Sequence, residues 1–80
     1  MRIDKFLKVS RLVKRRTVAK EMADQGRIKV NGKKVKSSYD VKIDDILEVG
    51  YGERAIKAKV VDLRETTKKA EAMELYELVD

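Results

Sequence analysis

Positive charge is concentrated at the start of this 80-residue chain. Eight Lys and Arg side chains fall within the first 20 residues, and Asp4 is the only acid among them. The eight are Arg2, Lys5, Lys8, Arg11, Lys14, Arg15, Arg16 and Lys20. Cations at this density suit the phosphates of a nucleic acid, because neutralising phosphates releases condensed counterions and the planar Arg guanidinium bridges two phosphate oxygens. The pattern therefore predicts a nucleic-acid-binding surface, and a solvated helical face is the plainer alternative.

The two halves of the chain differ in charge. Residues 1–36 hold 13 basic and three acidic side chains, whereas residues 37–80 hold seven basic and 11 acidic ones, so their net charges are +10 and −4. Such asymmetry favours a nucleic acid or an anionic membrane as the partner of the basic half. Membrane-surface helices place large apolar side chains opposite their cations, and here the small apolar faces are needed by the core. A nucleic acid is therefore favoured, with a basic adaptor for an acidic protein or anionic membrane surface as the alternative.

The residue types leave little room for enzymatic chemistry. The chain has no His and no Cys, so it lacks the commonest general base, the commonest metal ligand and any thiolate. Asp44 and Asp45 follow Asp40 closely, but without further ligands at suitable spacing they are interpreted as turn residues. We expect no catalytic residues, no cofactor and no metal.

Aromatic residues indicate which kind of nucleic acid is bound. The chain has four, namely Phe6, Tyr39, Tyr51 and Tyr76. Proteins that bind single strands stack bases on exposed aromatic side chains, whereas here Phe6 is expected in the core and the tyrosines are far apart in sequence. Binding should depend on backbone shape and phosphate positions, which favours structured RNA over a single strand that is read by its sequence.

Two helices are expected to carry the cations. The first is predicted over residues 4–9 with Asp4 as its N-cap. The second is predicted over residues 18–25, with Thr17 as its N-cap and Gly26 where it ends. Its apolar face consists of Val18, Ala19, Met22 and Ala23. The free N–H groups at the start of this second helix would favour a bound phosphate beside the preceding arginine pair.

Short strands are expected after the second helix. Residues 27–30 alternate as a half-buried strand does, and Asn31-Gly32 is a strong hairpin signal before a second strand over residues 33–36. Residues 43–49 are predicted to contain a further strand, and residues 55–63 to form another, with Tyr51-Gly52 as the turn between them. The order of elements indicates an α+β fold, in which two N-terminal helices pack on a small, mostly antiparallel sheet.

The end of the chain is expected to form a short helix over residues 68–79, capped by Thr66-Thr67. A strand over residues 75–79 is the alternative. Met73, Tyr76 and Val79 are predicted to cover the sheet, because so small a domain needs the additional apolar burial; docking of a partner is the other interpretation of these side chains. We therefore divide the chain into an RNA-binding domain over residues 1–65 and a helical tail over residues 66–80.

The motifs resemble those of the S4 domain family of RNA-binding domains, named after a small-subunit ribosomal protein. They are Arg2–Leu7, Arg11, Arg15–Ala19, Gly26–Lys33 and Val41–Ile46. The resemblance extends over about residues 1–49, and Asp44 departs from it because the family usually has Gly there, which puts the geometry of that turn in question. It implies an αL-type fold with RNA lying across the helices. The implied RNA contacts are Arg2, Lys5, Arg11, Arg15 and Arg16, and Asp4 is expected to orient a neighbouring Arg.

Within that family the chain is similar to stand-alone bacterial proteins of ribosome-associated quality control and to a longer heat-shock protein. This similarity implies that the partners are rRNA of the large ribosomal subunit, peptidyl-tRNA left after stalling, and an RqcH-type tailing factor that adds C-terminal alanines. A ribosome-assembly factor remains the alternative. The charged N-terminus and the lack of an 18-residue apolar run predict a cytoplasmic protein with no membrane partner. A monomer is expected.

A steep dependence of binding on salt follows from the predicted phosphate contacts. RNA affinity should fall at least about a hundredfold between about 50 and 200 mM monovalent salt, because several counterions are released on binding. Titration of a labelled, structured RNA at a series of KCl concentrations measures this dependence. An affinity that stays flat across the series would contradict the electrostatic interpretation.

Overall fold

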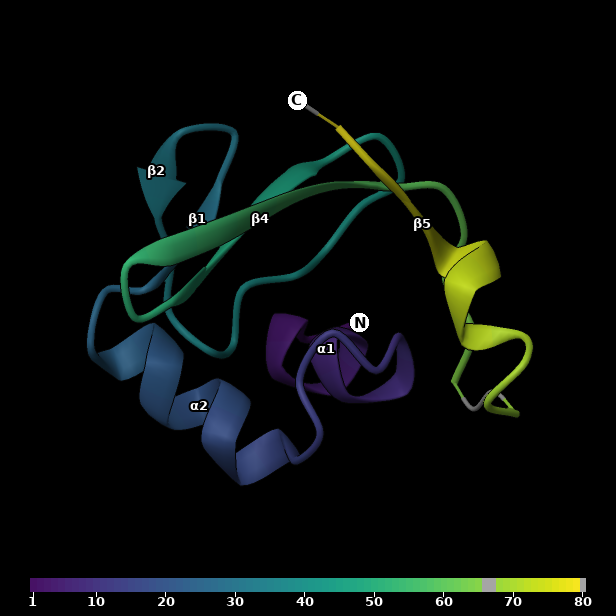
Figure 1. Ribbon diagram of the computed structural model, residues 1–80, viewed down its shortest axis with the longest axis horizontal. Coiled ribbons are helices and arrows are strands. Elements are labelled where there is room, and N and C mark those ends of the chain that lie inside the picture. Colours follow the sequence, from purple (N-terminus) through teal and green to yellow (C-terminus); the bar gives the residue numbers. More distant parts are fainter. Residues whose placement is uncertain (66–67, 80) are drawn as a thin grey trace.

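Two helices lie side by side beneath one face of a five-stranded antiparallel sheet (Figure 1). The computed structural model describes residues 1–65 and 68–79. The helices are α1 (Ile3–Val9) and α2 (Arg16–Asp24). The strands are β1 (Ile28–Val30), β2 (Lys33–Lys34), β3 (Ile46–Tyr51), β4 (Arg54–Val60) and β5 (Tyr76–Leu78), arranged in the order β2-β1-β3-β4-β5. The predicted α+β class is confirmed.

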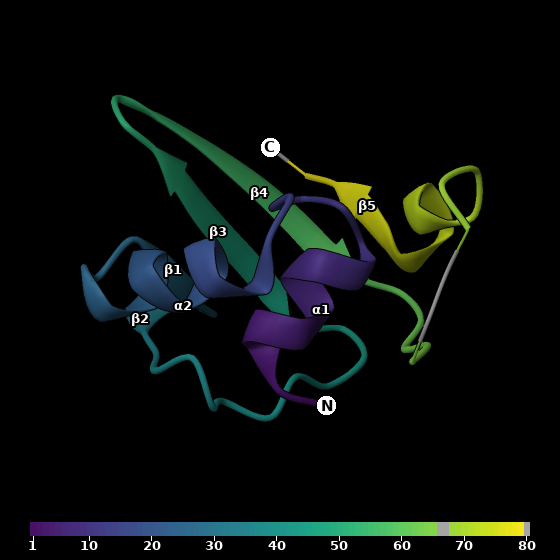
Figure 2. The same ribbon diagram turned by 90° about the horizontal axis from the view of Figure 1, so that it is seen from below.

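The core fills the space between the helices and the sheet. Phe6 and Leu7 of α1 are fully buried, as are Ile28 and Leu47 on the facing strands. In α2 the side chains of Ala19, Met22 and Ala23 are buried as predicted, but Val18 is 40% exposed. The burial of these apolar faces fixes both helices on the sheet and leaves their polar faces toward solvent. Figure 2 shows both helices on the same side of the sheet.

The second helix begins earlier than predicted and ends one residue before the predicted end, with Gly26 terminating it as expected. Arg15 is its N-cap residue, so Thr17 already lies inside the helix, and no side-chain hydrogen bond caps this end within the described residues. At the other end Gly26 has φ +74°. Its N–H donates to the Ala23 carbonyl at 3.0 Å, and the next N–H donates to the Met22 carbonyl at 2.9 Å. This pair of bonds is a Schellman motif, which requires the left-handed conformation that Gly adopts readily.

The β1–β2 hairpin turns at Asn31 and Gly32, whose φ values are +52° and +85°. Asn31 also joins this turn to β3: its amide oxygen accepts the Ile46 N–H at 3.0 Å, and its amide nitrogen donates to Asp45 at 3.2 Å. The buried Asp45 carboxylate accepts two further hydrogen bonds, from the Lys42 N–H and the Tyr39 hydroxyl. The bond to Asp45 raises the pKa of Tyr39 above its ordinary value. Asp45 is therefore a structural residue of this turn.

The third strand begins at Ile46, because a turn precedes it. Asp44 adopts φ +77°, and the Asp45 N–H donates to the Lys42 carbonyl at 3.1 Å. Ile43 lies before the strand and is 55% exposed. β3 also continues through Tyr51, so the turn to β4 begins at Gly52 and not at Tyr51. The left-handed conformation at Asp44 is the one that Gly adopts most readily.

The tail adds a strand to the sheet and does not form the helix predicted over residues 68–79. A single 3₁₀ turn, η1 (Ala72–Leu75), is followed directly by β5. β5 pairs with β4 through Ala58–Val60. This pairing satisfies backbone N–H and C=O groups of β4 that a helical tail would leave unpaired. Ala72 and Leu75 are buried, whereas Met73, predicted to cover the sheet, is 74% exposed. The predicted cap Thr66-Thr67 lies outside the described residues.

We predict that Asp44→Gly stabilises the fold by about 1 kcal/mol, or about 4–8 °C in Tm, because Gly relieves the left-handed strain. Asp44 also lies 3.5 Å from the Lys59 ammonium, but such an exposed ion pair contributes little. Asp44→Asn is the matched control, since it removes the charge and tolerates the same backbone conformation. Thermal unfolding of both variants tests this, and a Gly variant no more stable than the Asn variant would show that the turn is unstrained.

Candidate nucleic-acid interface

Asp4 holds two arginines from different helices in one place. Its side chain is 4% exposed, and its two carboxylate oxygens lie 3.1 Å from Arg2 and 3.3 Å from Arg16. A buried carboxylate is costly unless it is paired, so this arrangement is strongly favoured. The two arginine side chains remain about half exposed, at 50% and 48%. Each guanidinium has five N–H donors, which leaves some of them free to face a ligand.

We call Arg2, Asp4 and Arg16 the Asp4 clamp. It confirms the expectation that Asp4 orients a neighbouring Arg, and it corrects the prediction that Asp4 is an N-cap. Arg2 is the N-cap residue of α1, and Asp4 lies within the first turn. Arg16 is the first residue of α2. The start of each helix therefore contributes one arginine to the same point on the surface.

A second group of cations lines a hollow next to α1. The hollow has a volume of about 380 Å³, and its lining consists of Lys8, Arg11, Lys14 and Lys69. We call it the basic hollow. Arg11 has φ +62°, a left-handed conformation that is rare outside Gly, Asn and Asp. This residue turns the chain directly after α1, where its N–H donates to the Lys8 carbonyl at 3.1 Å.

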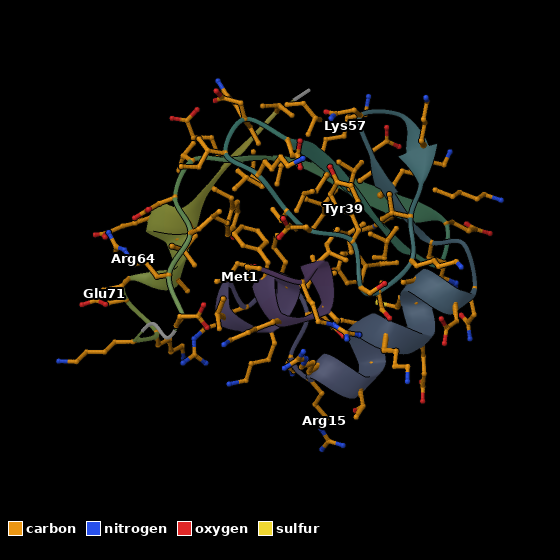
Figure 3. All side chains as sticks on the ribbon, turned by 180° about the vertical axis from the view of Figure 1, so that it is seen from behind. Met1, Arg15, Tyr39, Lys57, Arg64 and Glu71 are labelled. Carbon is orange, nitrogen blue, oxygen red and sulfur yellow. The ribbon has the colours of Figure 1, made fainter. Side chains whose placement is uncertain are left out.

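Arg15, the N-cap residue of α2, directly follows Lys14 of the basic hollow in the sequence. Together with Arg11 and Lys14 it borders a neighbouring hollow whose floor includes Val18 and Met22. Figure 3 shows the Arg15 side chain pointing away from the sheet, beyond the helices. Successive cations from the helix connection therefore border two adjoining hollows on the helical side of the molecule.

The remaining two predicted cations differ in their surroundings. Lys20 is exposed on α2, one helical turn after Arg16. Lys5 donates to Glu65, which lies 60 residues later in the sequence and directly before the tail, and the Lys5 side chain stays 34% exposed. This hydrogen bond lowers the pKa of Glu65 below its ordinary value. Lys5 thus ties α1 to the start of the tail.

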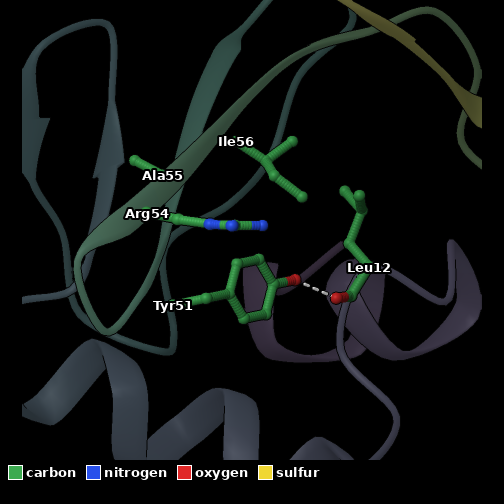
Figure 4. Close-up of a pocket in the computed structure, with 5 residues that line it drawn as sticks. All are labelled: Leu12, Tyr51, Arg54, Ala55 and Ile56. Atoms are coloured by element: carbon green, nitrogen blue, oxygen red, sulfur yellow. Dashed lines mark hydrogen bonds between the residues drawn. The ribbon is translucent and has the colours of Figure 1, made fainter.

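A tyrosine fixes the connection between the two helices. The Tyr51 hydroxyl donates to the Leu12 carbonyl, with Arg54 and Ile56 beside the ring (Figure 4). Partial burial raises the pKa of Tyr51 above its ordinary value. Because Leu12 lies between Arg11 and Lys14 in sequence, this bond attaches the cation-bearing connection to the end of β3.

The site has the chemistry of an anion-binding surface. Among residues 1–65 and 68–79, no cluster of three or more His, Cys, Asp or Glu could hold a metal ion. The helices of the described chain are too short or too polar to cross a membrane. The arrangement offers guanidinium and ammonium donors at fixed positions, which suits phosphate oxygens.

Sequence reasoning missed three parts of this surface. Lys69 joins the basic hollow from the tail, Glu65 pairs with Lys5, and Tyr51 holds the helix connection. The Lys68-Lys69 pair is visible in the sequence as a basic pair, but no local pattern places it beside α1. All three contacts join segments far apart in sequence.

Comparisons with known proteins identify the family and the fold of this chain. The S4 domain family model matches residues 1–47. A Bacillus subtilis protein named "RQC P-site tRNA stabilizing factor" is 56% identical over 79 residues, covering 99% of this chain and 92% of the relative. A Streptococcus pneumoniae protein of the same name is 53% identical over 79 residues, covering 99% and 90%. The trimeric structure of Vibrio cholerae heat shock protein 15 superimposes with a TM-score of 0.92 at 26% identity, covering 99% of this chain and 81% of that one. The resemblance recognised in the sequence is confirmed.

We predict that Arg16→Ala weakens binding to a structured RNA about 5- to 30-fold, since one charge-assisted contact contributes about 1–2 kcal/mol. The domain should stay folded, because Arg2 still neutralises Asp4. Arg27→Ala is the matched control: this exposed arginine lies outside the clamp, at a hollow near β1 and β3. Fluorescence titration gives the affinities and circular dichroism checks the fold. Equal losses in the two variants would argue against a specific role for the clamp.

Proposed function

The chain belongs to the S4 domain family, and on this premise we propose that it binds rRNA of the large ribosomal subunit and the peptidyl-tRNA held there. The observation that carries the proposal is the Asp4 clamp, in which one buried carboxylate fixes Arg2 and Arg16 at one point. Around it we assign RNA contacts to Lys5, Lys8, Arg11, Lys14, Arg15 and Lys20. These side chains supply positioned charge for a folded RNA backbone.

The names of the relatives support the more specific part of the proposal. They describe factors that stabilise P-site tRNA in RQC. For this chain we infer the same task on large subunits that keep peptidyl-tRNA after stalling. By holding that tRNA, the protein would support an RqcH-type factor in adding alanines to the C-terminus of the nascent chain.

We assign no catalytic step to this protein. Its contribution is binding energy, which keeps a tRNA in position while other components carry out the chemistry. Association with the ribosome would place the protein in the cytoplasm. We also propose that it acts as a monomer. We further propose that residues 1–65 form the RNA-binding domain and that residues 66–80 form a tail, of which β5 completes the sheet.

Co-sedimentation with purified large subunits tests this function. We predict that more protein sediments with subunits that carry peptidyl-tRNA than with vacant ones, and that it slows release of that tRNA. Arg16→Ala should reduce both effects, because the clamp would then hold a single arginine. Arg27→Ala serves again as the control.

Two outcomes would contradict the proposal. Equal binding to vacant and tRNA-carrying subunits would show that the protein does not bind the tRNA. Preferential binding to immature subunits would instead indicate an assembly factor. A reconstituted tailing reaction tests the role in tailing separately. Alanine tails of equal length with and without the protein would contradict that role and leave the proposed RNA binding intact.

A further inference from the structure

The basic hollow contains one residue that lies beyond the part of the chain matched by the S4 family model. Lys8, Arg11 and Lys14 come from α1 and the helix connection, within the matched residues 1–47. Lys69 comes from the tail and completes the lining. Figure 1 shows residues 68–79 beside α1, on the side away from α2.

Several contacts hold the turn that carries Lys69. The Lys68 carbonyl accepts the N–H groups of Glu71 and Ala72 at 2.9 and 3.1 Å. After this turn, Ala72 and Leu75 are buried and β5 pairs with β4. Before it, Glu65 is bound by Lys5 of α1. Lys69 is thus brought to α1 by anchored structure on both sides.

The charges around the hollow are unbalanced. Its lining includes no acid, and none of its four cations forms an ion pair with another residue in the described part of the chain. A hollow lined by one sign of charge focuses the electrostatic potential and attracts a counter-charge. Arg11 reaches it from a left-handed backbone conformation, and such strain is often found at functional sites.

We propose that Lys69 completes a phosphate-binding site with Lys8, Arg11 and Lys14, through which the tail grips the backbone of the RNA bound by the helices. The inference rests on the proposed function and assigns the tail a role in binding. The ligand is a phosphodiester group of that RNA, since four cations converge on a space open to solvent. Removal of one such contact lowers the number of counterions released on binding.

The experiment compares Lys69→Gln with Lys68→Gln. Both variants remove one exposed lysine from the same turn, but only Lys69 lines the hollow. Fluorescently labelled proteins are titrated with purified large ribosomal subunits at several KCl concentrations and constant magnesium. Lys69→Gln should weaken binding several-fold and reduce the slope of log affinity against log salt by about one, whereas Lys68→Gln should leave the slope near that of the original protein.

The stability of the free protein separates binding from a structural role. At low salt, Lys69→Gln should leave Tm unchanged or raise it, because one of four repelling charges is removed. A lower Tm, or equal slopes for both glutamine variants, would overturn the inference. If Arg16→Ala weakens binding while Lys69→Gln does not, only this inference fails. If Arg16→Ala has no effect, the proposed function itself fails.

Discussion

The buried carboxylate of Asp4 must be neutralised, and the start of each helix supplies one arginine to do so. Without these partners an ionised carboxylate in this position would destabilise the fold. The same requirement restricts Arg2 and Arg16 to a small volume, which reduces the conformational entropy that they lose on binding. Asp4 is acidic, but it helps to build the cation-rich surface because it fixes the positions of two arginines.

The sheet determines where that carboxylate lies. The Ile3 N–H donates to the Tyr39 carbonyl at 2.8 Å, which attaches the start of α1 to the loop before β3. Tyr39 in turn bonds to Asp45, and Asp45 bonds to Asn31 in the β1–β2 turn. On the other side, Tyr51 attaches the helix connection to the end of β3. The position of the cations therefore depends on hydrogen bonds that start in the sheet.

Local signals in the sequence were sufficient for much of this fold. Gly26 and Asn31-Gly32 marked the end of α2 and the first hairpin correctly, because each requires a positive φ that few residues adopt. The start of α2 was misplaced, since no side-chain cap marks it and its first residue, Arg16, pairs with the distant Asp4. The tail was predicted as a helix because its periodicity allowed one, whereas the open edge of β4 selects a strand.

The candidate site, like the fold, could be predicted from the sequence only in part. Its cations could be named from their density along the chain, but their grouping into the Asp4 clamp and the basic hollow could not. Asp4 pairs with residues at the starts of two helices, and Lys69 joins the basic hollow from a tail whose last strand pairs with the sheet. The unusual residue at position 44 was visible in the sequence, and its left-handed backbone explains why Gly suits that position.

Replacement of Asp4 by Asn tests the central claim most directly, because charge and geometry then predict opposite results. Asp4→Asn raises the net charge from +6 to +7, so electrostatic attraction alone would strengthen RNA binding. We predict instead that a folded Asp4→Asn variant binds large ribosomal subunits more weakly than the original protein, because Arg2 and Arg16 lose their common anchor. Tighter or unchanged binding by the folded variant would contradict the account.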